Sequence, residues 1–381
     1  MRNNIKIAVI GLAVLIVGTV AYVFTQTGSV NKDQYTPVPA SVLEASSRKQ
    51  TDTKLFVPAT NVHWGLTNGD WVEVSNNLWN DVMFGTMNSV RDMQLIQIGR
   101  RAHFVTNSSF ATLVVHNVGS NIKIYVDGSL KVEQKLLDDN KQIELPIYSG
   151  MTGKRDILVV WGGVCELAGI YISADSDMFL YNSTQKKMVV IGDAFVQGLL
   201  DKNPGMNTYT AQLNDKLGLE VINQGIMDTD VNVSYEKIGH SSGLDRLSLD
   251  VVYEKPDYVL VNYGQVAVQS IIKGDMTKEK YFEDYKNFIQ QMRDALPNVK
   301  IFCSGVISMP AYDDIKLKSY NDGIKAAIAG ITDTHFIDMS GCWNEKNYKL
   351  YLSDDMVNPN DGGHKFLADK YTEFIKPYLG N

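Results

Sequence analysis

Two places in the C-terminal half of the 381-residue sequence hold a histidine beside a group that could assist it in catalysis. His364 follows Asp361 by three residues, a spacing at which a carboxylate could orient an imidazole that acts as a general base. His240 stands directly before two serines, whose hydroxyl groups a nearby imidazole could activate as nucleophiles. Asp361, His364 and His240 therefore form one candidate site. The six histidines show no spacing typical of metal ligands, so we expect no metal and no cofactor.

A third place has the right shape for a reactive residue but lacks the residue. The segment VVIGDAFVQG, residues 189–198, predicts a buried strand that runs into a tight turn flanked by glycines. The position that such a turn exposes is Ala194, whose methyl group has no reactivity. Asp193 is expected to cap the turn by accepting hydrogen bonds from backbone N–H groups.

The elements that would position these residues follow a β-α alternation after residue 186. Near-continuous apolar runs predict strands buried on both faces of a parallel sheet, at residues 188–191, 219–223, 258–263, 299–305 and 335–339. A helix is predicted after Thr277 and a second one through Tyr320 and Ile324. In such α/β folds ligands bind beyond the carboxyl ends of the strands. The turns after Ile191 and Asn223, among others, should therefore converge on any site.

Residues 55–180 show a different pattern, in which apolar and polar residues alternate in short runs separated by turn residues. This pattern is typical of an all-β sandwich. The predicted domains are thus a β-sandwich at 55–180 and an α/β domain at 186–381.

The order of short motifs in the second domain resembles the SGNH (GDSL-type) hydrolases. The motifs are GD after the first strand, NQG after the second, YG after the third, and DxxNPNxxGH before the last helix. The preceding domain, with GRRAHFVTNSS and IYVDG, resembles the jelly-roll of a class of carbohydrate O-acetylesterases. The resemblance implies a flavodoxin-like three-layer sandwich with a parallel sheet, preceded by a jelly-roll-like domain.

Matched to the family, this chain lacks the groups that perform the reaction. The resemblance places Ala194 at the nucleophile position, Asp355 at the triad aspartate and Asn358 at the catalytic histidine. The oxyanion-hole positions are Ala194, Gly225, which keeps its backbone donor, and Val266, where the family has asparagine. Methyl and amide groups can neither attack a carbonyl nor accept a proton at neutral pH.

We therefore expect a natural pseudoenzyme, inactive as given, that binds a polysaccharide or acylated glycan. An engineered knockout would explain Ala194 and Asn358 but scarcely also Val266. The alternative is an active carbohydrate esterase or O-acyltransferase with a non-standard constellation around Asp361, His364 or His240.

The N-terminus predicts where the protein resides. Residues 7–24 are uncharged and apolar and nearly long enough to cross a bilayer, so residues 1–24 are expected to be a transmembrane anchor. Arg2 and Lys6 precede the apolar run, which predicts a cytoplasmic N-terminus and extracytoplasmic domains. A cleaved signal peptide is the alternative, and would make the protein secreted. Residues 25–54 are predicted to be a stalk. The net charge of −7 excludes nucleic acid as an expected partner.

Overall fold

The alternation of apolar and polar residues produces the strands of the first part of the described chain. Along Arg101–Thr106 and Asn121–Val126, every second residue is buried and those between are partly exposed. The computed structural model describes residues 53–380, with the exception of 60, 62, 70, 77–80, 86–98, 180, 182–184, 235–239, 311 and 313. The anchor predicted at residues 1–24 and nearly all of the stalk predicted at 25–54 therefore lie outside the described residues. Lys54, the last residue of the predicted stalk, belongs to β1.

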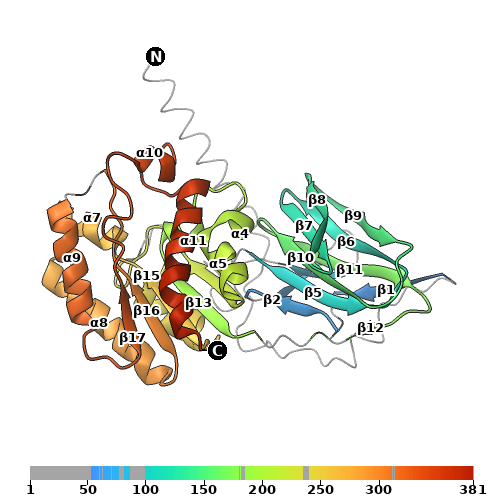
Figure 1. Ribbon diagram of the computed structural model, residues 1–381, viewed down its shortest axis with the longest axis horizontal. Helices are drawn as coiled ribbons and strands as arrows, with labels where there is room; N and C mark the ends of the chain where they lie inside the picture. Colours follow the sequence, from blue (N-terminus) through green and yellow to red (C-terminus); the bar gives the residue numbers. More distant parts are fainter. Residues whose placement is uncertain are drawn as a thin grey trace, which may run out of the picture. The chain divides into compact units, whose positions relative to one another are not determined.

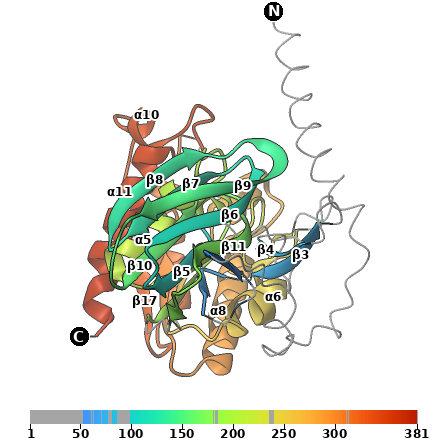
Figure 2. The ribbon, with the colours of Figure 1, turned by 90° about the vertical axis from the view of Figure 1, so that its right-hand side faces the viewer.

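These strands form two six-stranded antiparallel sheets that share one apolar core (Figures 1 and 2). The first sheet has the order β3 (Val72–Asn76), β4 (Asp81–Gly85), β11 (Glu166–Ser173), β6 (Phe110–Val118) and β9 (Asp138–Ser149), with β1 (Lys54–Pro58) paired to β11. The second has the order β12 (Met178–Phe179), β5 (Arg101–Thr106), β10 (Arg155–Trp161), β7 (Asn121–Val126) and β8 (Ser129–Lys135), with β2 (Gly65–Thr67) paired to β5. Both sheets contribute fully buried residues to the core, such as Leu113 and Ile124.

The second part of the chain is built on a five-stranded parallel sheet, as the sequence predicts. Its order is β14 (Glu220–Gly225), β13 (Lys187–Gly192), β15 (Tyr258–Asn262), β16 (Lys300–Ser304) and β17 (Thr334–Ile337). The first strand in the sequence, β13, thus lies between the second and the third, which is the flavodoxin-like order. Residues of β13, β14 and β15 are almost entirely buried, because helices cover both faces.

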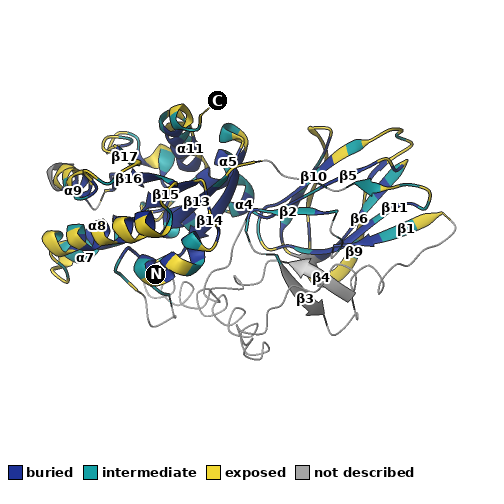
Figure 3. Ribbon diagram, turned by 90° about the horizontal axis from the view of Figure 1, so that it is seen from below, coloured by how far each residue is buried: buried dark blue, intermediate teal, exposed yellow. Residues whose placement is uncertain are grey.

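The helices lie on both sides of this sheet (Figure 3): α5 and α11 cover one face, and α8 lies on the other with α9 beside it. The helix predicted after Thr277 is confirmed, and the Thr277 hydroxyl accepts a hydrogen bond from Lys280 N. The helices are α3 (Ala194–Gln197), α4 (Pro204–Asn207), α5 (Tyr209–Leu217), α6 (Gly243–Arg246), the π-helical η3 (Leu247–Val252), α7 (Gln265–Lys273), α8 (Lys278–Ala295), α9 (Asp314–Ala327), α10 (Tyr348–Tyr351), α11 (Asp361–Ile375) and the 3-10 turn η4 (Lys376–Tyr378). None of the described helices is both long and apolar enough to span a bilayer.

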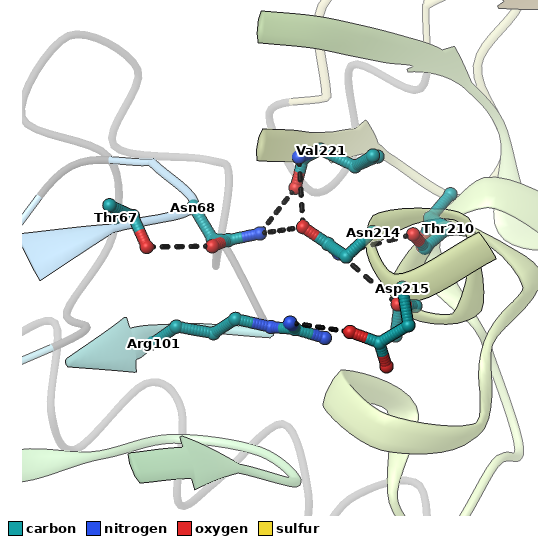
Figure 4. Close-up of polar contacts among 8 residues, drawn as sticks. Thr67, Asn68, Arg101, Thr210, Asn214, Asp215 and Val221 are labelled. Atoms are coloured by element: carbon teal, nitrogen blue, oxygen red, sulfur yellow. Dashed lines mark hydrogen bonds and ion pairs between the residues drawn. The ribbon is translucent and has the colours of Figure 1, made fainter. Parts of the chain in front are cut away.

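Asn68 joins the β-sandwich to the α/β domain (Figure 4). Its side-chain nitrogen donates to Asn214 Oδ1 at 2.7 Å and to Val221 O at 2.8 Å, and the residue is 2 % exposed. Arg101 Nη1 donates to Asp215 Oδ1 at 2.8 Å nearby, but this ion pair is exposed to solvent. The buried amide should contribute more stability than the exposed ion pair, which contributes little. Loss of the amide removes a donor from the buried Val221 O and leaves Asn214 Oδ1 with Val221 N alone.

We predict that Asn68→Gly lowers the free energy of unfolding by about 2 kcal/mol. Asn68 has a φ of 69°, which glycine adopts without strain, so the loss reports on the side-chain bonds. The matched control is Asp215→Asn, for which the expected loss is less than about 1 kcal/mol. Urea denaturation measures both. Equal losses in the two variants would contradict the assignment of the domain junction to Asn68.

Candidate functional site

The carboxyl edge of the parallel sheet brings three of the predicted segments together. Gly192, the last residue of β13, pairs with Gly225 on one side and with Asn262 on the other. The turn that holds Asp193 and Ala194 therefore starts beside the ends of β14 and β15, which is where ligands bind in folds of this class.

Ala194 is the first residue of the short helix α3, and Asp193 is its N-cap. Asp193 Oδ1 accepts a hydrogen bond from Phe195 N at 2.9 Å, which confirms the predicted cap. Phe195 and Val196 are buried, whereas Ala194 is partly exposed. The turn thus presents residue 194 toward solvent and offers a methyl group there.

Gly225 is held against α3 more tightly than the sequence indicates. A Cβ atom at this position would lie 2.2 Å from Gln197 N, so only glycine fits. The resemblance places the backbone N–H of Gly225 in the oxyanion hole, and in the structure this N–H donates to Asn223 Oδ1 at 2.9 Å. The Asn223 amide is fixed in turn, since its nitrogen donates to Val196 O at 2.6 Å and to Thr210 Oγ1 at 2.9 Å.

Val266 is the second residue of α7 and is partly exposed. The first turn of this helix is held by Asp230, whose Oδ2 accepts hydrogen bonds from Gly264 N at 2.9 Å and Ala267 N at 3.0 Å. Val266 itself contributes only methyl groups at the position where the resemblance expects an amide donor.

Asp355 holds the side chain of Asn358 in one orientation. The resemblance places a catalytic histidine at this position. Asp355 Oδ2 accepts from Asn358 Nδ2 at 2.7 Å, and Oδ1 accepts from the backbone N–H groups of Val357 and Asn358, each at 3.0 Å. Asn358 is 6 % exposed, and its Oδ1 is buried with no partner among the described residues. The carboxylate therefore orients an amide whose free atom is a hydrogen-bond acceptor and not a titratable nitrogen.

The structure does not assemble the alternative site of Asp361, His364 and His240. Asp361 is exposed at the first turn of α11, whereas His364 is fully buried and its Nδ1 accepts from Tyr209 N at 3.4 Å. Burial lowers the pKa of His364 to about 4, so the ring is neutral at pH 7. His240 Nδ1 lies 3.1 Å from Met227 O, and the Ser242 hydroxyl donates to Asp245 in the capping box of α6.

Helix α11 contacts α4, the next helix after α3. Asp201, which follows α3, has its pKa raised by burial and further by the charge of Asp361. Across the described ranges, no three histidine, cysteine or acidic side chains are grouped so that they could hold a metal ion. The two turns that the resemblance assigns to the site are therefore the one with Ala194 and the one with Asn358.

Residues 190–366 match the model of the GDSL-like Lipase/Acylhydrolase family. They form a GDSL-like domain. The match spans β13 to α11, and it includes Ala194, Gly225, Val266, Asp355 and Asn358.

Solved structures share the fold of both parts of the chain. A salicylyl-acyltransferase from a tetracycline biosynthetic pathway is 16% identical, with a TM-score of 0.64 over 86% of this chain and 98% of that one. A family two carbohydrate esterase from Clostridium thermocellum in complex with cellohexaose is 18% identical, with a TM-score of 0.57 over 83% and 99%. Its counterpart from Cellvibrio japonicus is 13% identical, with a TM-score of 0.59 over 85% and 97%. A search of curated proteins returned no match.

Two of the buried carboxyl groups in the GDSL-like domain have a strongly raised pKa, and the sequence pointed only to Asp193. Burial raises the pKa of Asp193 to about 8 and that of Asp230 to about 6. Asp230 accepts two further hydrogen bonds, from Val231 N at 2.8 Å and from the Tyr281 hydroxyl at 3.1 Å. No local pattern marks Asp230, because the N–H groups at the start of α7 that it binds lie more than 30 residues further along the chain.

We predict that Asp193→Asn makes the stability of the protein less sensitive to pH. Between pH 4 and 8 the unfolded chain has released the Asp193 proton while the folded chain retains it, so stability falls as pH rises. Asparagine keeps the acceptor for Phe195 N but does not titrate. Between pH 6 and 8 the decline should be shallower in the variant by up to about 1.4 kcal/mol per pH unit, the value for one proton. Parallel profiles in urea unfolding would refute the buried, protonated state.

Proposed function

We propose that the GDSL-like domain binds a polysaccharide or acylated glycan without hydrolysing an ester. The observation that carries the proposal is the pair of turns in which Ala194 stands at the nucleophile position and the Asn358 amide takes the place of the imidazole. Acyl transfer through a serine needs a hydroxyl group and a neighbouring atom that accepts its proton. Neither group is present at these two positions.

The groups that would stabilise an oxyanion are also missing or already engaged in other hydrogen bonds. Val266 has no donor, and the Gly225 N–H already donates to Asn223 Oδ1. Removing a single triad member or a single oxyanion donor each reduces turnover by orders of magnitude. Their joint absence supports a binding role over slow hydrolysis.

Binding is supported by the hydrogen bonding of the Asn358 side chain. Asp355 holds Asn358 in one orientation through the side-chain bond of 2.7 Å, and leaves Asn358 Oδ1 buried without a partner among the described residues. A buried acceptor without a donor is unfavourable by about 1–3 kcal/mol, and a ligand hydroxyl that donated to it would remove this penalty. Sugar hydroxyl groups can donate in this way.

The structural neighbours support the class of ligand. Two of them are family two carbohydrate esterases that hold cellohexaose-type ligands, and another is described by divergent catalytic and non-catalytic binding functions of its active site. We propose non-catalytic binding for this chain as well, because alanine occupies the position of the nucleophile.

We also propose that the protein is anchored in the cell membrane by residues 1–24, with both folded domains on the extracytoplasmic side. The uncharged run at residues 7–24 behind Arg2 and Lys6 supports this topology. A glycan of the cell surface or its surroundings would then be within reach of the domain.

We predict that Ala194→Ser combined with Asn358→His creates esterase activity that the natural sequence lacks. The serine supplies the nucleophile, and the imidazole takes the orientation that Asp355 now gives the amide. Hydrolysis of p-nitrophenyl acetate and labelling by a fluorophosphonate probe are the measurements. Ala194→Ser alone is the matched control, and should neither turn over nor label because its hydroxyl has no base.

The unmodified protein should show no turnover above buffer and should bind at least one glycan on an array. Turnover by the unmodified protein that a single substitution in the cleft abolishes would overturn the proposed inactivity. Silence on an array of plain and acetylated polysaccharides would overturn the proposed binding.

A further inference from the structure

A hollow lies on the β-sandwich, and neither Ala194 nor Asn358 lines it. Its volume is about 690 Å³, within the range of small-ligand sites. Its walls come from β5, β7 and β10 and, at one end, from α4 and α5 of the GDSL-like domain. No residue of β13, β15 or α11 lines it, so it is separate from the two turns of the candidate site.

The strand register determines the pattern of its floor. Val160 of β10 pairs with Arg101 of β5 on one side and with Lys123 of β7 on the other. In the next row of the same face, Leu158 pairs with His103 and Tyr125. Directly paired residues project from the same face of an antiparallel sheet. The hollow therefore has an apolar centre, formed by Leu158 and Val160, with polar side chains of β5 and β7 on either side and Asp156 beyond Leu158 on β10.

Several polar side chains at the edges are already held in place. Arg101 Nη1 donates to Asp215 Oδ1 at 2.8 Å, and His103 Nε2 contacts Asp156 Oδ1. Asp127 accepts from Arg155 Nη1 at 2.9 Å, and this carboxylate also accepts from Asp156 N at 3.0 Å. Side chains fixed in this way lose little conformational freedom when a ligand binds.

The charges along the edges exclude one class of ligand and favour another. Arg101, His103 and Lys123 face the hollow together with Asp127, Asp156 and Asp215, so neither sign dominates. A phosphate-rich or strongly anionic ligand would meet the three carboxylates. Hydroxyl groups both donate and accept, and so match a border that offers both. The apolar centre matches the C–H face of a sugar ring.

We propose that this hollow, formed by β5, β7, β10 and the α4–α5 segment, is a second binding site that takes a short neutral oligosaccharide. The inference does not depend on the candidate site in the GDSL-like domain. If both sites bind, one anchored molecule holds a glycan at two points, which raises its overall avidity.

The test uses the full chain in detergent and isothermal titration calorimetry with cellohexaose, xylohexaose and mannohexaose, and with tetragalacturonate as an anionic probe. We expect at least one neutral hexasaccharide to bind, and Leu158→Glu to weaken it about tenfold or more, because the substitution puts a charge in the apolar centre. The matched control is Leu137→Glu, at a leucine that is 66% exposed and does not line the hollow. It should leave the affinity unchanged.

Asn358→Ala separates the two sites. Binding that persists in this variant and is lost in Leu158→Glu assigns the oligosaccharide to the hollow. Binding that is lost in Asn358→Ala and unchanged in Leu158→Glu overturns the inference while the function proposed for the GDSL-like domain stands. Absence of binding by all three neutral probes, or binding of tetragalacturonate alone, also overturns it. If Leu158→Glu does not fold, Lys123→Ala replaces it, with an expected loss of about fivefold.

Discussion

The geometry of the candidate site depends on how closely α3 lies against the neighbouring strand. A side chain at Gly225 would collide with the backbone of Gln197, and one at Gly192 would lie 2.4 Å from Asn262 O. These contacts involve backbone atoms, so they fix the position of residue 194 whatever its side chain is. Scaffold and chemistry are therefore independent at this point in the fold. A serine can be replaced by alanine while the turn, its cap and the strand ends stay where they are.

In the turn with Asp355, the backbone position likewise does not depend on the catalytic group, but here hydrogen bonds fix it. The Asp355 carboxylate accepts hydrogen bonds from two backbone N–H groups and from the Asn358 amide. An apolar residue at 358 would remove the side-chain donor, and the exposed Asp355 carboxylate would then be left with the two backbone donors and solvent. Asparagine satisfies the carboxylate as a ring N–H would, but cannot accept a proton from a hydroxyl group. Asparagine at this position thus keeps the loop in place without supplying a base, which agrees with the binding role proposed above.

The sequence predicted those features that local patterns determine. Apolar runs placed all five parallel strands to within about two residues, because a strand covered on both faces must be apolar throughout. The cap at Asp193 followed from a carboxylate at a strand end. The bond from Gly225 N to Asn223 Oδ1 was not predicted, although an asparagine two residues before a glycine is a local pattern that favours such a bond. The hollow was not predicted either. It depends on the register of β5, β10 and β7, which lie side by side in the sheet but are not consecutive along the chain.

If the hollow takes the ligand proposed above, the contacts at the domain junction would keep the structure in place. Arg101 is shared between the junction and the hollow, and its ion pair with Asp215 is exposed on the carboxylate side. Exposed pairs of this kind contribute at most about 1 kcal/mol. A ligand hydroxyl can therefore replace Asp215 as the partner of Arg101 with little loss of stability. The buried Asn68 amide keeps its bonds to Asn214 and Val221 meanwhile, so α5 stays in place beside β5.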